Sequence, residues 1–107
     1  MKLNLRTAVF TILAASIVTP AFAQSAGADA YKAKCAMCHG VDGQGNTPAG
    51  KALKAKSFKD PDLIKASDAD LIAYIKTGKG KMPSYAGQFT DDQLQDVVIH
   101  IRTLQKQ

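Results

Sequence analysis

Two cysteines, Cys35 and Cys38, stand three residues apart, and His39 directly follows the second. Residues three apart in a helix lie on the same face, so both thiols can reach one edge of a flat ring. The imidazole of His39 then lies beneath that ring, where it can bind a central iron. This spacing is typical of the attachment of c-type haem. We therefore expect one covalent haem c held by Cys35, Cys38 and His39, with His39 as an iron ligand.

Three other uses of the cysteine pair have to be weighed against haem. A thioredoxin-like redox pair is expected beside a βαβ unit, and the chain has no strand-like alternation. A zinc site needs two more ligands, for which His39, His100 and a carboxylate are available. A disulfide between Cys35 and Cys38 would close a loop too short to remove much entropy from the unfolded chain. Haem attachment explains the pair better than these alternatives do.

The opposite side of the iron needs its own ligand, and Met82 is our candidate. Met82 lies in a loop next to Pro83, whose stiff backbone lowers the cost of presenting the sulfur. A core methionine that fills a gap is the alternative interpretation. Met37, between the two cysteines, is expected to point away from the iron, and His100 is expected to be a packed or surface histidine. Ligation by His39 and Met82 would fill both axial positions, which suits electron transfer rather than catalysis.

The start of the chain is typical of a secretory signal peptide. Two basic residues precede an apolar run over 8–18, and a small-x-small pattern ends at Ala23. The apolar run, about 11 residues, is shorter than the ~20 that cross a bilayer as a helix. We therefore expect residues 1–23 to be removed during export to the periplasm, leaving 24–107 as one domain with no membrane span.

The mature domain is predicted to be all-α, with three or four helices joined by long loops. Helix patterns occur in four segments, 28–38, 61–65, 67–78 and 90–104. Ser67 and Thr90 are suited to cap the last two of them. Residues 40–50 contain four glycines and a proline, which is typical of a loop, and 51–58 is ambiguous. A domain this small, with long loops, needs a cofactor to organise it.

Lysine dominates the charge of the domain. Without the signal peptide, 12 of the 14 Lys and Arg residues remain against nine Asp and no Glu, and Arg102 is the single arginine among them. Arginine makes most bidentate contacts to phosphate and guanine, so we do not expect nucleic acid as a partner. The lysines are either ordinary solvated side chains or a docking surface for an acidic redox protein. The candidates for that surface are Lys51, Lys54, Lys79 and Lys81.

These features resemble the class I cytochrome c family, in particular its small bacterial and photosynthetic-type monohaem members. The resemblance covers about 27–104. Three segments carry the resemblance most specifically: the haem motif together with residues 40–43 after it, residues 79–83, and residues 96–102. It implies the cytochrome c fold, wrapped around one covalent haem.

The resemblance also implies roles for single residues. Gly27 and Tyr31 would lie where the first and last helices cross, because the missing side chain of Gly27 lets two backbones approach. His100 stands where the family often has an aromatic against the first helix. Pro48 would offer its carbonyl to the Nδ1–H of His39 and so orient the ring.

Tyr74 and Tyr85 would line the haem or bond one of its propionates, with ordinary core packing as the alternative. The function implied is a periplasmic single-electron carrier, a monomer that meets acidic donor and acceptor proteins and is not an enzyme. Two alternatives stay open. One is a dedicated haem subunit of a periplasmic dehydrogenase or oxidase, and the other is a haem ligand sensor or weak peroxidase with Met82 not bound.

Overall fold

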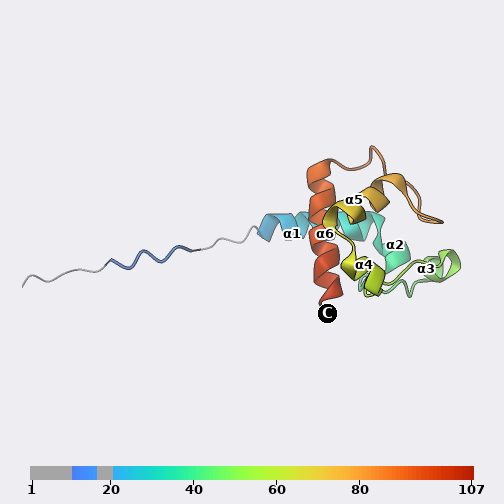
Figure 1. Ribbon diagram of the computed structural model, residues 1–107, viewed down its shortest axis with the longest axis horizontal. Helices are drawn as coiled ribbons and strands as arrows, with labels where there is room; N and C mark the ends of the chain where they lie inside the picture. The colour runs from blue at the N-terminus through green and yellow to red at the C-terminus, as the bar shows by residue number, and fades with distance from the viewer. Residues whose placement is uncertain (1–10, 17–20) are drawn as a thin grey trace, which may run out of the picture.

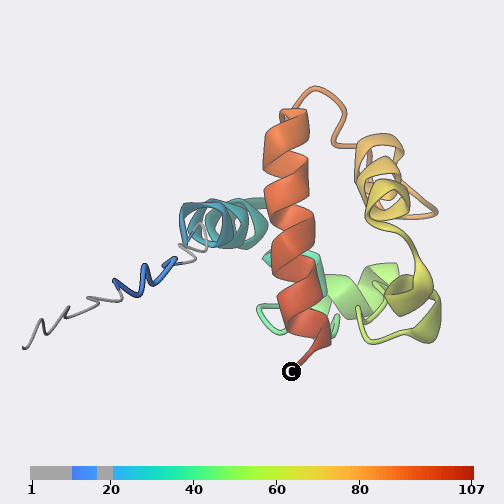
Figure 2. The ribbon, with the colours of Figure 1, turned by 60° about the vertical axis from the view of Figure 1, so that its left-hand side comes forward.

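The computed structural model describes residues 11–16 and 21–107. Its elements are six helices: α1 (Ala21–Lys34), α2 (Ala36–His39), α3 (Pro48–Leu53), α4 (Pro61–Lys65), α5 (Asp68–Thr77) and α6 (Asp91–Gln105). Lys79 and Met82 form an isolated antiparallel β-bridge. The described residues contain no β-strand beyond this bridge. The all-α prediction is confirmed, and the described residues form six helices where we expected three or four. α6 stands at the centre of both ribbon views, with the start of α1 on one side and α3, α4 and α5 on the other (Figures 1 and 2).

The expected signal peptide, residues 1–23, lies mostly outside the described residues. Of this segment, 11–16 are exposed and non-helical, and Ala21 begins α1. Cleavage before Gln24 therefore stays a prediction. None of the helices in the described part of the chain is long and apolar enough to cross a membrane.

The last helix forms where its caps and apolar spacing predict it. The Thr90 hydroxyl accepts a hydrogen bond from the backbone N–H of Gln93, and the Gln93 side chain accepts one from the backbone N–H of Thr90. This capping box satisfies two of the free donors at the helix start. One stripe of α6 is buried and forms the centre of the core: Leu94, Val97, Val98, Ile101 and Leu104. Ile99, off that stripe, is 39% exposed.

The helix expected over 28–38 is divided at Cys35 into α1, which begins earlier at Ala21, and the single turn α2. Among the other short helices, the starts are predictable with one exception. Ser67 caps α5 by accepting from the N–H of Asp70, and Pro61 opens α4. The exception is α3, which lies partly within the glycine-rich stretch that we expected to be a loop. Its signals are Thr47, which caps it, and Pro48 at its first position, where a proline's missing N–H costs nothing. Because of the glycines around these two residues, we predicted a loop where the chain forms a helix of six residues.

α1 lies across α6 (Figure 1), and the two backbones nearly touch at Gly27. A Cβ added to Gly27 would lie only 2.1 Å from the carbonyl oxygen of Asp96. One turn on, Tyr31 is 1% exposed and packs its ring against His100, with 4.9 Å between the centroids. The positions implied for Gly27, Tyr31 and His100 at this crossing are confirmed.

We expect His100 to make the crossing sensitive to acid. Burial lowers the pKa of His100 below its ordinary value of 6.5. Because the folded protein favours the neutral ring, the contribution of His100 is complete above pH 6.5 and is lost as the pH falls below that value. We expect His100→Gln to weaken the fall in the free energy of unfolding between about pH 7 and about pH 5.

Denaturant unfolding of both proteins at the two pH values measures this difference. The visible spectrum should be the same in both proteins, since His100 is not our candidate ligand. Identical pH dependence in the two proteins would show that His100 does not cause the effect.

Candidate functional site

The cysteine pair lies where the first helical stretch changes direction. Cys35 separates α1 from α2, and its N–H still donates to the carbonyl of Tyr31, at 2.7 Å. α2 is a single turn in which the N–H of His39 donates to the carbonyl of Cys35. The turn ends at Gly40, whose φ of +80° favours glycine, and the Gly40 carbonyl accepts from the Tyr31 hydroxyl at 2.6 Å. The haem motif is therefore fixed at both ends by hydrogen bonds to Tyr31.

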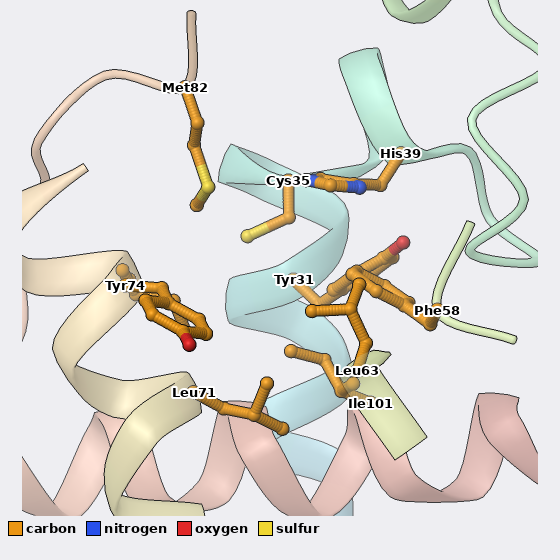
Figure 3. Close-up of a pocket in the computed structure, with 10 residues that line it drawn as sticks. Tyr31, Cys35, His39, Phe58, Leu63, Leu71, Tyr74, Met82 and Ile101 are labelled. Atoms are coloured by element: carbon orange, nitrogen blue, oxygen red, sulfur yellow. The ribbon is translucent and has the colours of Figure 1, made fainter. Parts of the chain in front are cut away.

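A cavity of about 470 Å³ opens beside this turn and is lined by Cys35, Cys38 and His39. A smaller apolar cavity of about 60 Å³ continues toward the core, between α1, α5 and α6 (Figure 3). Cys35, His39, Leu63, Tyr74 and Met82 line both. The combined space lies in the size range of cofactor sites. Its donors, two thiols, an imidazole and a thioether, fit a c-type haem.

Cys35 and Cys38 are not joined by a disulfide. Burial raises the pKa of Cys35 to about 11, and the nearby Cys38 adds to the rise. Before the haem is attached, Cys35 is therefore favoured as a neutral thiol. In Figure 3 its sulfur points into the space between Met82 and Tyr74.

The ring of His39 is held by one hydrogen bond and one stacked neighbour. Its Nδ1–H donates to the carbonyl of Lys56 at 3.3 Å, and Phe58 stacks on it with 4.6 Å between ring centroids. Burial lowers the pKa of His39, and the hydrogen bond to Lys56 opposes this. The ring is thus favoured in its neutral form, with Nε2 free to bind a metal.

The carbonyl that orients His39 is therefore that of Lys56, where the resemblance implied Pro48. Pro48 is the first residue of α3, so its carbonyl belongs to the hydrogen-bond ladder of that helix. α3 supports the motif from behind instead. The Thr47 hydroxyl donates to the carbonyl of Met37 at 2.6 Å, and the backbone of Gly50 lies against the carbonyl of Cys38.

Met82 reaches the cavity from a tight turn after α5. Lys79 and Met82 exchange two backbone hydrogen bonds of 3.0 and 3.1 Å around Gly80, whose φ is +60°. The turn is tied back to α5, because the Ser84 hydroxyl donates to the Lys76 carbonyl at 2.6 Å and the Tyr85 N–H donates to the Ile75 carbonyl. The Met82 side chain therefore comes from a fixed backbone, and it lines both cavities with His39.

Two tyrosines complete the side of the cavity near α5. Tyr85 lines the larger cavity and donates its hydroxyl hydrogen to the carbonyl of Lys34 at 3.2 Å. Tyr74 lines both cavities, and the Lys79 ammonium lies 4.3 Å from the centre of its ring. Both tyrosines therefore line the cavity, and contact of either with the haem or with a propionate stays a prediction.

Sequence reasoning missed the wall on the His39 side. Phe58, 8% exposed, and Leu63 line this side of the cavity, and both come from the segment that we judged ambiguous or assigned to a short helix. An aromatic residue in a lysine-rich stretch was the one available signal for Phe58.

Comparison with known proteins identifies the family. A family model described as "Cytochrome C oxidase, cbb3-type, subunit III" matches residues 22–101. Cytochrome c6 from Leptolyngbya boryana is 34% identical over 79 residues, which cover 72% of this chain and 87% of the relative. The chain belongs to the cytochrome c family.

Other relatives give the same answer for this cytochrome c. Cytochrome c6 from Synechococcus elongatus is 33% identical over 75 residues, covering 70% of this chain and 83% of the relative. Cytochrome c6 from Gloeothece citriformis is 38% identical over 92 residues, which cover 80% of this chain and 77% of the relative. The resemblance to class I monohaem cytochromes c is confirmed, and with it one covalently bound c-type haem as the cofactor. Cys35 and Cys38 are the two cysteines at the spacing that this attachment requires.

Proposed function

We propose that this cytochrome c is a periplasmic single-electron carrier whose haem iron is ligated by His39 and Met82. One observation carries the proposal: both side chains line the same cavity as Cys35 although they come from elements far apart in the chain. α2 supplies His39, and the turn after α5 supplies Met82. Among the alternatives, His100 packs on Tyr31 at the helix crossing, and Met37 is 75% exposed.

The haem supplies the one-electron change of its iron between ferrous and ferric states. The residues around it hold it and set its potential. His39 offers a neutral ring fixed by Lys56 and Phe58, and the Met82 thioether favours the ferrous state. Held by both His39 and Met82, the haem would have no position open to a substrate, and the tied turn of Met82 would limit rearrangement on electron exchange. This combination favours a carrier over an enzyme.

The partner surface that we propose is the lysine-bearing mouth of the larger cavity. Five lysines line it: Lys34, Lys54, Lys56, Lys79 and Lys81. Of the four lysines that we expected in a docking surface, Lys54, Lys79 and Lys81 are among them. The fourth, Lys51, is exposed on the neighbouring α3. A positive rim around an electron-transfer edge steers acidic donor and acceptor proteins. A periplasmic location rests on the signal-like residues 1–23, and we propose that the carrier is a monomer.

Charge reversal at the mouth should slow reaction with an anionic oxidant. We expect Lys81→Glu to lower the rate at which ferricyanide oxidises the reduced protein, by a few-fold at low salt, with the difference vanishing at high salt. Lys106→Glu makes the same charge change at the C-terminal end of α6, outside the cavity lining, and should have a smaller effect. Stopped-flow kinetics over a range of salt concentrations measures both. Equal effects of the two variants would show that the mouth is not the site of electron exchange.

A permanent haem subunit is the second candidate, and the description of the matching family model favours it. Size-exclusion chromatography of the protein purified from its native host separates the two. A free protein of the mature size supports the carrier, and a stable complex with a dehydrogenase or oxidase supports the subunit. Carbon monoxide added to the reduced protein tests the sensor alternative, since a carrier with Met82 bound should show no change in its spectrum.

A further inference from the structure

The last turn of α6 holds the segment that contacts His39. The side-chain amide of Gln105 donates from Nε2 to the carbonyl of Phe58 at 3.0 Å and to the carbonyl of Leu63 at 3.3 Å. These two residues form the cavity wall on the His39 side: Phe58 stacks on the imidazole, and Leu63 lines both cavities. One side chain of α6 therefore fixes two backbone points of that wall.

Arg102, one turn earlier, fixes Gln105 in turn. Its Nη1 donates to Oε1 of Gln105 at 2.9 Å, which leaves the amide nitrogen pointing at Phe58 and Leu63. The rest of the guanidinium binds the end of α4: Nη2 donates to the Ala66 carbonyl at 2.5 Å. Further acceptors are the carbonyls of Leu63 and Ile64 and the Asp68 carboxylate.

A planar guanidinium with five donors can satisfy so many acceptors at once, and a lysine ammonium cannot. Arg102 is the one arginine among the 12 basic residues of 24–107, and its side chain is 26% exposed. The single arginine of the domain therefore stands where several acceptors have to be bound by one side chain. Its contacts make it part of the cavity wall's support as well as of an ion pair.

Gln105 shares the support of this wall with other contacts, among them the edge-on packing of the Phe58 ring against Tyr31, with 6.0 Å between the centroids. It runs from Lys56, whose carbonyl accepts from His39, through Phe58 to α4 at Pro61. Besides the bond from Gln105, Phe58 is held by its N–H, which donates to the Gly43 carbonyl at 2.9 Å. Loss of the Gln105 bonds would leave the Phe58 carbonyl without this donor and the Leu63 carbonyl with Arg102 alone, which loosens the backbone on both sides of the stacked ring. Water would then reach His39 more easily, and the ring could turn.

We propose that Arg102 and Gln105 are positioning residues for the iron ligand His39. Acting through Phe58 and Leu63, they hold the orientation of the His39 ring and keep water from it, and so keep the reduction potential high. The inference rests on the proposed function, since it takes His39 as an iron ligand. A less polar, drier surrounding favours the ferrous state, so loosening the wall lowers the potential.

The test uses Gln105→Met, which keeps the length of the side chain and the charge of the protein but removes both donors. Arg102→Lys keeps the charge and removes the fork, and serves as a second variant should Gln105→Met not fold. Gln95→Met is the matched control, the same substitution at an exposed position of α6. All are purified with haem attached, and two quantities are measured. One is the reduction potential, and the other is the pattern of paramagnetically shifted haem-methyl NMR signals, which reports the orientation of the axial ligands.

We expect Gln105→Met and Arg102→Lys to lower the potential and change the NMR pattern, while Gln95→Met changes neither. Variants that match Gln95→Met in both quantities would overturn the inference, even where they unfold more easily. Absence of histidine ligation in the unmodified protein would instead overturn the proposed function. The two failures are therefore distinguishable.

Discussion

Replacing Met82 with alanine is expected to remove the far-red absorption band of sulfur-ligated ferric haem and to lower the reduction potential. The potential should fall on the order of a tenth of a volt, part of the roughly 0.8 V over which axial ligands tune haem. The thioether favours ferrous iron, and its loss leaves a coordination position open. The variant should therefore bind carbon monoxide when reduced, which the unmodified protein should not do.

Met37→Ala is the matched control for this experiment. Met37 lies between the two haem cysteines in sequence, but its side chain is 75% exposed, whereas Met82 lines both cavities. Its removal should leave the band, the potential and the absence of a carbon monoxide complex unchanged. Survival of the band in Met82→Ala, or its loss in Met37→Ala, would show that Met82 is not the ligand.

Gly27→Ala should cost about 2–3 kcal/mol of the free energy of unfolding, because it overpacks a contact between two backbones. The new Cβ would lie 2.1 Å from the carbonyl oxygen of Asp96 and 3.2 Å from the backbone nitrogen of Val97. Neither atom can move without shifting α6, so α1 and α6 must separate. In a helix free of such contacts the same change would gain about 1 kcal/mol through helix propensity.

Ala33→Gly, at an exposed position of the same helix, gives the scale of propensity alone. It should cost about 1 kcal/mol, clearly less than Gly27→Ala. Unfolding by guanidinium chloride, followed by the haem absorbance, measures both variants. A Gly27→Ala protein as stable as the unmodified one would show that the crossing is looser than the structure has it.

Local signals were enough to predict most of the fold. Thr90 with Gln93, Ser67 and Pro61 each act within a few residues of chain, and the helices start where they indicate. The exception, α3, has an equally local signal in Thr47 and Pro48, but the surrounding glycines outweighed it in our interpretation. Glycine count alone is a poor guide where a cap and a proline stand together.

The sequence indicated that the motif and a loop methionine belong to one site, and these residues line the same cavities; their roles toward the haem stay predictions. Cys35 and His39 follow from their spacing, and Met82 from its place beside a proline. The Lys56 carbonyl and the Phe58 ring meet His39 only because the chain between α3 and α4 folds back on α2. No spacing in the sequence encodes that return, and the resemblance to a family in which loops vary in length led to Pro48 instead.

An absorption spectrum of the purified protein, oxidised and reduced, tests the central claim most directly. We expect sharp bands of low-spin haem c in the reduced form, and a far-red band of methionine ligation in the oxidised form. The haem should stay with the polypeptide after acid–organic extraction, since Cys35 and Cys38 bond it. A high-spin spectrum, a missing far-red band or an extractable haem would contradict the account of a cytochrome with haem held by two thioethers and ligated by His39 and Met82.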